Sequence, residues 1–226
     1  MTWIDLGNPI PLDIPQRYER FRWPTQDIEF LTVPAQLELP TLDKVIFSRR
    51  TRHTFGSLTR AQISQFLWLS CRTIAKGNEC LGFPITQQPA PSAGAIHPIH
   101  IVLGEQNKDW KRYDPDQHAL TKLDELAQNR LAGLWDSIGH VVLYGNGAAL
   151  LFIAEPGMTY AKYDFGNSLV WRDSGVLIGH MALLAEALQL NFCPLGITGE
   201  PWISNLEVQH QLVGVGIALL GSRGNV

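Results

Sequence analysis

Six consecutive apolar residues, Ala149-Leu150-Leu151-Phe152-Ile153-Ala154, place the strongest single constraint on how this chain can fold. A strand with one face in water alternates apolar and polar residues, whereas a strand covered on both faces is apolar throughout. The run therefore predicts a strand that is covered on both faces.

Four segments carry the apolar spacing of helices. Leu42 begins a short helix with apolar residues at i, i+3 and i+4, and Thr41 is its candidate N-cap. Thr59 is a good N-cap for a second helix. Residues 121–135 and 174–190 complete the set, and the last segment has the strongest apolar stripe.

Two further segments, residues 99–103 and residues 217–220, have the apolar composition that predicts strands. Residues 111–116 indicate a strand end that enters a turn, after which a hairpin can follow, and residues 77–91 indicate a loop. Helices and strands are mixed without a regular alternation. The predicted fold class is therefore α+β and not a doubly wound sheet.

The first 40 residues differ from the rest of the chain. They contain prolines at positions 9, 11, 15, 24, 34 and 40 and show no sustained period. We expect residues 1–40 to form an extended arm that wraps another part of the protein, and residues 41–226 to form the folded domain.

Composition excludes several classes of protein. A net charge of −3 and a pI near 6.1 lack the basic excess that nucleic-acid binding needs. No charge-free run is apolar enough to predict a membrane span, and the first residues do not resemble a signal peptide. Three widely spaced cysteines form neither a disulfide framework nor a metal motif. We expect a cytoplasmic protein without a bound metal.

Three familiar motifs fail on inspection. The segment from Gly214 lacks the third glycine of a dinucleotide-binding loop and enters the last predicted strand. The segment from Gly166 lacks the closing glycine of a nucleophile elbow. His97 and His100 are spaced so that they point to opposite faces of a strand, which argues against a shared metal.

A cluster of cations is the first informative motif. Arg49, Arg50, Arg52 and His53 follow the short helix, together with the hydroxyl of Thr51. A guanidinium donates in a rigid fork that suits phosphate oxygens. The alternative interpretation is a solvated basic turn.

The second motif is Pro91-Ser92-Ala93-Gly94-Ala95-Ile96-His97-Pro98. Its small residues let the backbone approach a flat ligand closely, and its prolines fix the path of the chain. An ordinary turn before a strand is the alternative interpretation.

Taken in order, these segments resemble the nitroreductase-like flavoproteins, and in particular their SagB-like branch, the azoline (thiazoline/oxazoline) dehydrogenases. The cluster from Arg49 is similar to the family's RRSxRxF entry, and the segment from Pro91 is similar to the PSAGAxxP loop of the branch. Four further segments resemble the branch in the same order, beginning at Leu58, Arg112, Lys162 and Leu183. The resemblance covers residues 40–222.

The resemblance implies an α+β sandwich that forms an interlocked homodimer with FMN in two interfacial clefts. It places Arg49, Arg50, Thr51 and His53 at the phosphate and ribityl chain. It assigns the loop Pro91, Ser92, Ala93, Gly94 and Ala95 to the flavin of the opposite subunit. It also places Leu195, Gly196 and Ile197 beside the isoalloxazine, where a backbone N–H can donate to N5, and it makes Arg223 a second phosphate ligand.

The same resemblance suggests oxidation of an azoline ring in a peptide or similar substrate to the azole. Lys162 and Tyr163 match the candidate base of the branch, because a cation beside a phenol favours its deprotonated form. A cyclodehydratase complex is a candidate partner. Two alternatives stay open: an NAD(P)H-dependent nitroreductase or quinone reductase, and a non-catalytic flavin-binding or scaffold subunit. His53 at the third basic position of the entry motif and Ala95 at the position of a usual loop Asn are departures from the family pattern.

Overall fold

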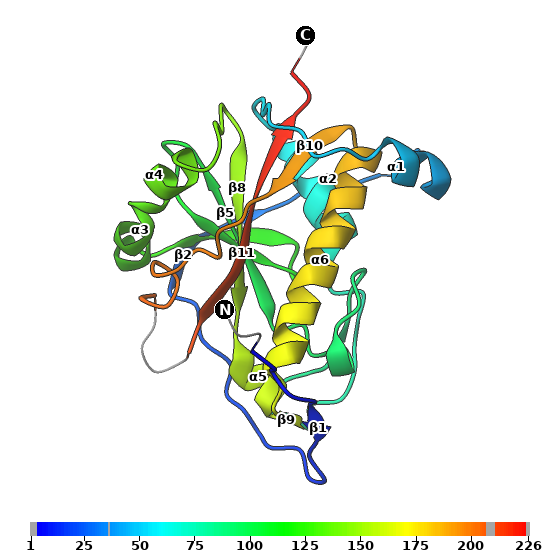
Figure 1. Cartoon of the computed structure of the whole chain (residues 1–226), viewed down its shortest axis with the longest axis vertical. Coiled ribbons are helices and arrows are strands. Elements are labelled where there is room, and N and C mark those ends of the chain that lie inside the picture. Colours follow the sequence, from blue (N-terminus) through cyan, green and yellow to red (C-terminus); the bar gives the residue numbers. More distant parts are fainter. Residues whose placement is uncertain (1–3, 36, 207–210, 225–226) are drawn as a thin grey trace.

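The structure is a computed structural model, and it describes residues 4–35, 37–206 and 211–224. Within these residues the chain forms a central antiparallel sheet with helices on both faces (Figure 1). Its seven strands are given in spatial order: β10 (Leu190–Pro194), β11 (Val213–Ser222), β8 (Ala148–Ala154), β5 (Ile99–Glu105), β6 (Lys111–Asp114), β7 (Ala119–Leu123) and β2 (Thr25–Phe30).

Smaller elements surround this sheet. The remaining strands are the pair β1 (Ile10–Pro11) and β9 (Tyr163–Asp164) and the pair β3 (Ala75–Lys76) and β4 (Thr86–Gln87). The helices are α1 (Leu42–Ser48), α2 (Arg60–Cys71), α3 (Glu125–Leu131), α4 (Leu134–Gly139), α5 (Pro156–Tyr160) and α6 (Asn167–Ala187), and a 3₁₀ turn covers Ala93–Ala95. No helix in the described part of the chain is long and apolar enough to cross a membrane.

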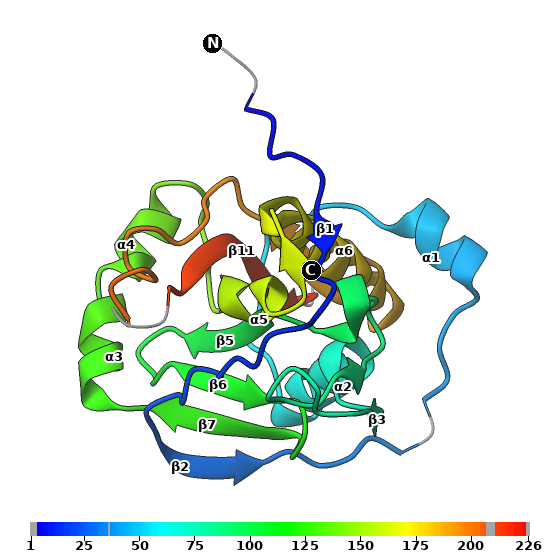
Figure 2. The same cartoon turned by 90° about the horizontal axis from the view of Figure 1, so that it is seen from below.

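The apolar run in β8 is covered on both faces, as its composition predicts, and all of its residues are buried. Leu150 and Phe152 pack into one core with residues of α2 and α6. Leu151 and Ile153 pack into a second core with residues of α3 and α4. Successive strand residues point to opposite faces, so one continuous run fills two cores. Figure 2 shows the two helix pairs on opposite sides of the sheet.

Helix α2 begins where the sequence predicts it. The side chain of Thr59 accepts from the backbone N–H of Gln62, whose side chain accepts from the N–H of Thr59 in return. The predicted apolar side of this helix, which includes Ile63, Phe66 and Leu67, is fully buried. The strands from Ile99 and Lys111 are also confirmed, and β6 and β7 form the hairpin.

The prediction of one helix over residues 121–135 is wrong. Residues 119–123 form β7, which pairs with both β6 and β2. Asp124 then starts α3, because its side chain accepts from the backbone N–H of Ala127 at 2.8 Å. Gly133 separates α3 from α4. The leucines of this segment therefore belong to three short elements and not to one helical stripe.

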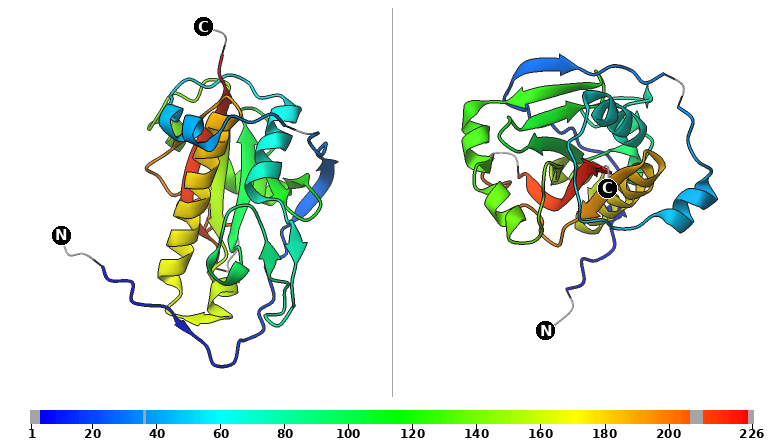
Figure 3. Two further views of the ribbon diagram at one scale, coloured as in Figure 1. Left: turned by 90° about the vertical axis from the view of Figure 1, so that its right-hand side faces the viewer. Right: turned by 90° about the horizontal axis from the view of Figure 1, so that it is seen from above.

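The boundaries of the long helix also differ from the prediction. Helix α6 begins at Asn167, seven residues before the predicted start at 174, and ends at Ala187. Gln189 has a positive φ of 57°, which ends the helix, and Leu190 already belongs to β10. Figure 3 shows α6 running along the sheet as the longest helix of the molecule.

The first 40 residues contain two strands that the sequence did not predict. Ile10 and Pro11 pair with β9, and Thr25–Phe30 add the edge strand β2 to the central sheet. The segment between β1 and β2 is hydrogen-bonded to the rest of the domain through its backbone. For example, the N–H of Tyr18 donates to the carbonyl of Leu81 at 2.8 Å. The stretch is therefore joined to the domain by its backbone.

Helix α1 packs differently from its prediction. Thr41 occupies the N-cap position, but its side chain makes no capping hydrogen bond. Val45 is buried, whereas Leu42 and Ile46, which share its predicted face, are 66% and 52% exposed. Phe47 is 78% exposed. A single chain therefore leaves most of this apolar helix uncovered, and Figure 2 shows α1 at the outer edge of the molecule.

Candidate active site

The loop from Pro91 to Ala95 is held by one carboxylate of α6. Ser92 Oγ donates to Asp173 Oδ2 at 2.5 Å, and the backbone N–H of Ala93 donates to the same carboxylate at 3.1 and 3.2 Å. The Ser92 hydroxyl also accepts from the backbone N–H of His97 at 3.0 Å. These bonds fix both ends of the loop, so its backbone has a defined path over the start of α6.

Gly94 is the point at which the loop meets Lys162 and Tyr163. Its φ of 65° lies in the left-handed region. A Cβ on Gly94 would stand 3.0 Å from Lys162 Nζ and 3.0 Å from Tyr163 Oη. The loop and the predicted Lys-Tyr pair therefore lie in contact within a single chain. Ala95 also has a positive φ, of 58°.

The N-terminal residues hold the backbone of the Lys-Tyr pair. The N–H of Leu12 donates to the carbonyl of Lys162 at 2.9 Å, and Pro11 pairs with Tyr163 in the β1–β9 ladder. The Lys162 ammonium lies 5.6 Å from the centre of the Tyr163 ring. Both side chains are half-buried, so they are fixed at the backbone yet open to a ligand.

The cationic segment converges with Arg223 on a carboxylate that the sequence analysis did not single out. Arg52 Nη1 lies 2.6 Å from Glu186 Oε2, and Arg223 Nη2 lies 2.7 Å from the same oxygen. Glu186 is 4% exposed. Burial raises the pKa of Glu186, but the hydrogen bonds from Arg52 and Arg223 outweigh it and hold the pKa below its usual value.

Backbone contacts explain why these distant residues meet. Asn191 Nδ2 in β10 donates to the carbonyl of Thr54 at 2.7 Å. Gly56 and Ser222 exchange backbone hydrogen bonds of 3.0 Å, so the segment after the arginines follows the end of β11 to Arg223. A signal for Glu186 was present in the sequence, because an acidic residue in the apolar stripe of a helix needs a partner.

The other predicted phosphate residues lie in different surroundings. Arg50 turns back on the end of α1 and donates to the carbonyls of Phe47 and Arg49 at 3.0 and 2.8 Å. His53 is exposed, and its Nδ1 lies 3.7 Å from Cys193 Sγ. Thr51 is exposed. The Arg49 side chain is half-buried and makes no hydrogen bond or ion pair with any described residue.

The segment that follows β10 begins close to His53, because Cys193 near the end of β10 contacts the His53 ring. The N–H of Leu195 donates to the carbonyl of Ile217 at 2.8 Å, so it is already used within the sheet. Gly196 is exposed, and a Cβ placed there would meet no atom within 4 Å. Any backbone donation to a ligand from this segment would therefore come from Gly196 or Ile197.

The two groups of predicted residues lie at opposite parts of α6. Asp173 holds the loop that contacts the Lys-Tyr pair, whereas Glu186 holds Arg52 and Arg223. They are 13 residues apart in one helix, which corresponds to about 20 Å along its axis. The structure thus brings together Gly94, Lys162 and Tyr163, and separately Arg52 and Arg223, but not these two groups. Within the described residues, no cluster of three His, Cys, Asp or Glu side chains is arranged to hold a metal.

Comparison with known proteins finds relatives by structure but not by sequence. No family model matches the chain. No curated protein matches it either. Among solved structures, a proposed nitroreductase of Ralstonia eutropha JMP134 has a TM-score of 0.62 at 14% identity, covering 94% of this chain and 98% of the other.

Two further structures have similar folds. One is the Escherichia coli microcin synthetase McbBCD complex with truncated pro-MccB17 bound, with a TM-score of 0.56 at 16% identity over 87% of this chain and 79% of the other. The second is a nitroreductase with bound FMN from Bacteroides fragilis NCTC 9343, with a TM-score of 0.50 at 13% identity over 83% and 91%. These likenesses confirm the α+β, nitroreductase-like fold that the resemblance implies.

Proposed function

We propose that this chain is an FMN-dependent oxidoreductase that works as a homodimer and oxidises an azoline ring of a peptide or similar substrate to the azole. The observation that carries this proposal is the contact at Gly94, where the side-chain-free loop borders Lys162 and Tyr163. A flat ring system needs close backbone approach on one side and a proton acceptor near the reacting carbon. The loop offers the first and the Lys-Tyr pair the second.

The arginines fit the anionic end of FMN. Arg223 Nε is buried and has no hydrogen-bond partner among the described residues. Arg49 also carries unpaired donors, and Arg52 lies beside Arg223 at Glu186. A chain with a net charge of −3 must concentrate its cations locally to hold a doubly charged phosphate. We infer that Arg49, Arg52 and Arg223 bind the phosphate, with Arg50, Thr51 and His53 at its border.

The separation along α6 supports a site made by two chains. Within one chain, the loop lies about 20 Å along the helix from the arginines. An antiparallel second copy would bring the loop of one protomer to the arginines of its partner. Leu42, Ile46 and Phe47 of α1 supply exposed apolar surface for such an interface.

The chain's own groups have separate tasks in this reaction. When bound, FMN would supply the acceptor for the hydride that leaves the azoline ring. Tyr163 Oη is the candidate acceptor for the proton that leaves the neighbouring ring carbon, and the Lys162 ammonium lies 5.6 Å from the centre of the Tyr163 ring. Asp173 keeps the loop in place through Ser92. An N–H of Gly196 or Ile197 is the candidate donor to the flavin ring.

Two alternative functions are considered. An NAD(P)H-dependent nitroreductase or quinone reductase is favoured by the similarity to the Ralstonia protein, and it needs no proton acceptor at Tyr163. A non-catalytic flavin-binding or scaffold subunit is the other rival. The likeness to a chain of the microcin synthetase complex supports an azoline substrate and a cyclodehydratase as a candidate partner.

An activity assay separates these functions. Purified protein loaded with FMN is given a thiazoline-containing peptide in one reaction, and NADPH with a nitroaromatic compound in another. We expect azole formation, with a loss of about 100-fold in Tyr163→Phe and little change in the matched control Tyr160→Phe. Nitro reduction that survives Tyr163→Phe, without azole formation, would favour the nitroreductase. Flavin binding without either reaction would favour the scaffold.

A further inference from the structure

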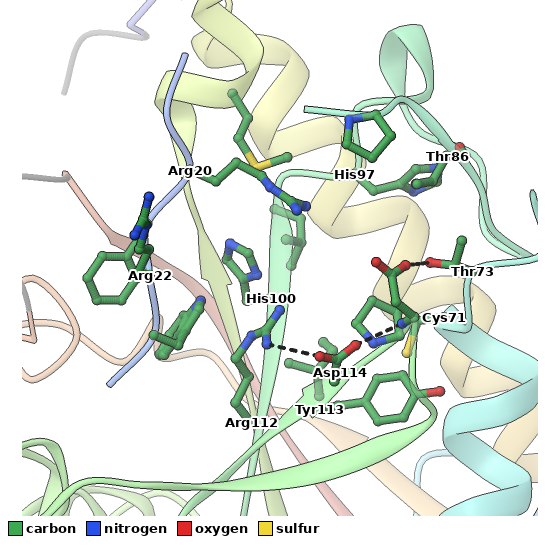
Figure 4. Close-up of a pocket in the computed structure, with 18 of the residues that line it drawn as sticks. Arg20, Arg22, Cys71, Thr73, Thr86, His97, His100, Arg112, Tyr113 and Asp114 are labelled. Atoms are coloured by element: carbon green, nitrogen blue, oxygen red, sulfur yellow. Dashed lines mark hydrogen bonds and ion pairs between the residues drawn. The ribbon is translucent and has the colours of Figure 1, made fainter. Parts of the chain in front are cut away.

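A cavity of about 840 Å³ lies between the N-terminal stretch and the central sheet, and its lining reaches Ile96, next to the loop proposed for FMN. Residues 17–23 form one wall, and β5 and β6 form the other (Figure 4). Its size is within the range of pockets that hold small organic molecules. The described lining includes none of the loop 91–95, the Lys-Tyr pair, the arginines 49–52 or Arg223.

The wall formed by residues 17–23 is anchored to the domain through Glu155. Glu155 is fully buried, and it accepts from the backbone N–H of Phe21 at 2.5 Å and from His100 Nε2 at 2.8 Å. Burial is the largest influence on the pKa of His100 and lowers it, while the hydrogen bond to Glu155 acts in the opposite direction. The cavity is thus a built feature, because its two walls share a buried hydrogen-bonded pair.

Two residues of the lining carry buried donors without a hydrogen-bond partner among the described residues. Arg112 lines it with a side chain that is 18% exposed, and its buried Nε has no hydrogen-bond partner among the described residues. The nearest carboxylate oxygen, Asp114 Oδ2, is 3.9 Å from Arg112 Nη1, too far for a hydrogen bond. Trp23 also lines the cavity. Its Nε1 is buried and has no hydrogen-bond partner among the residues that the structure describes.

Arg20 adds a second guanidinium to the same space. Figure 4 shows Arg20 and Arg112 reaching into the cavity from opposite walls, with His100 between them. Arg20 stacks over the ring of Phe83 at 5.8 Å, and it forms no ion pair with a described carboxylate. Arg20 is exposed and Arg112 is largely buried, and their like charges repel each other, so an anion between the two guanidiniums would pair with both.

The acidic residues of the lining are already engaged. Glu19 pairs with Arg22 at 2.9 Å, and Asp116 accepts from Lys76 and Thr73. Asp114 accepts from the backbone N–H groups of Asp116 and Gln117. Asp114 stays within ion-pair distance of Arg112, at 3.9 Å, without a hydrogen bond to it, and the charge of these carboxylates disfavours a dianion such as a phosphate monoester.

We propose that this cavity binds a small aromatic monocarboxylate, with its carboxylate between Arg20 and Arg112 and its ring against Trp23, which lies next to Arg112. Guanidinium groups match the planar carboxylate, and aromatic side chains supply the apolar wall. The site is separate from the FMN site in its residues. It therefore stands whether or not the proposed oxidoreductase function is correct.

Calorimetric titration of the full-length protein with 2-naphthoate tests this proposal. We expect saturable binding of one molecule per chain, and binding at least about tenfold weaker for the neutral 2-naphthamide and for the dianion phenyl phosphate. Arg112→Gln and Arg20→Gln should each weaken naphthoate binding by about tenfold or more. Arg172→Gln is the matched control, because Arg172 is exposed on α6, donates to Ser168 and does not line the cavity. It should change the affinity by less than about twofold.

The outcomes are separable. The exposed Arg20 keeps the test valid if circular dichroism shows that Arg112→Gln does not fold. Saturating FMN should leave the naphthoate affinity unchanged, since the two sites share no residues. Absence of saturable binding, equal binding by the arginine variants, or displacement of naphthoate by FMN would overturn the proposal.

Discussion

Ser92 and Asp173 lie 81 residues apart in the chain, yet the Ser92 hydroxyl donates to the Asp173 carboxylate at 2.5 Å. The same carboxylate also accepts from the backbone N–H of Ala93. Through these bonds the start of α6 sets the position of a loop that carries no large side chain of its own. A substitution at Asp173 should therefore shift Gly94 and alter its contact with the Lys-Tyr pair.

Asp173→Asn should weaken this link. The amide can still accept from Ala93, but its nitrogen cannot accept from Ser92, so a charge-assisted bond is lost. We expect the free energy of unfolding to fall by about 1–3 kcal/mol. In a Ser92→Ala background the same change should cost less, and a double-mutant cycle by urea unfolding measures the coupling. Independent, additive effects would contradict the role assigned to this pair.

Glu186→Gln tests the convergence of the two arginines. The substitution removes the charge that Arg52 and Arg223 share, and we expect unfolding to become easier by about 1–3 kcal/mol. Arg50→Gln is the control, because Arg50 contacts only backbone carbonyls beside α1, and its effect should stay within about 0.5 kcal/mol. Equal losses in the two variants, measured by urea unfolding, would show that Glu186 has no special structural role.

Gly94→Ala tests the close approach between the loop and the Lys-Tyr pair. Alanine at a φ of 65°, with its Cβ 3.0 Å from two polar atoms, should lower the free energy of unfolding by about 1–2 kcal/mol. Gly179→Ala is the contrasting control, because it lies in α6 with no atom within 4 Å of the added Cβ. That variant should gain about 0.5–1 kcal/mol. Thermal unfolding of both variants measures these changes in stability. A Gly94→Ala protein as stable as the wild type would contradict the close approach at Gly94.

Acid should destabilise the protein through Glu155. Burial raises the pKa of this carboxyl, but the hydrogen bond from His100 and its other partners outweigh burial and lower it. A lowered native pKa stabilises the fold above the usual carboxylate pKa of about 4.3, and this contribution is lost as the pH falls through the native value. Unfolding free energies from pH 7 to pH 3 should therefore decline at the acid end. The decline should be shallower in Glu155→Gln, and an identical slope would rule out this contribution.

The sequence was most informative where local chemistry decides the structure. The apolar run in β8 and the Thr59–Gln62 capping box predicted their elements correctly, since burial on both faces and reciprocal capping leave a clear pattern. Residues 121–135 were misassigned because leucines at helical spacing also suit a strand followed by short helices. The decisive signal there was Asp124, an N-cap in the middle of the predicted helix.

The candidate site was only partly predictable. The resemblance assigns Gly94 to the flavin of the opposite subunit and Lys162 and Tyr163 to the base, and these roles stay predictions. The contact of all three residues within one chain was not predicted. Glu186 was missed, because its importance depends on Arg52 and Arg223 arriving from other elements. Asp173 was missed as a site residue for the same reason. The local pattern indicates that Glu186 needs a partner, but the identity of the partner follows only from the tertiary fold.

Sedimentation of FMN-saturated protein, followed at the visible absorbance of the flavin, tests the central claim most directly. We expect the flavin to sediment with a dimer at two FMN per two chains. In Phe47→Glu, which places a charge on the exposed face of α1, the protein should sediment as a monomer and the flavin should remain free. Wild-type protein that sediments as a monomer, or as a dimer without flavin, would contradict the proposal of a flavin site shared between two chains.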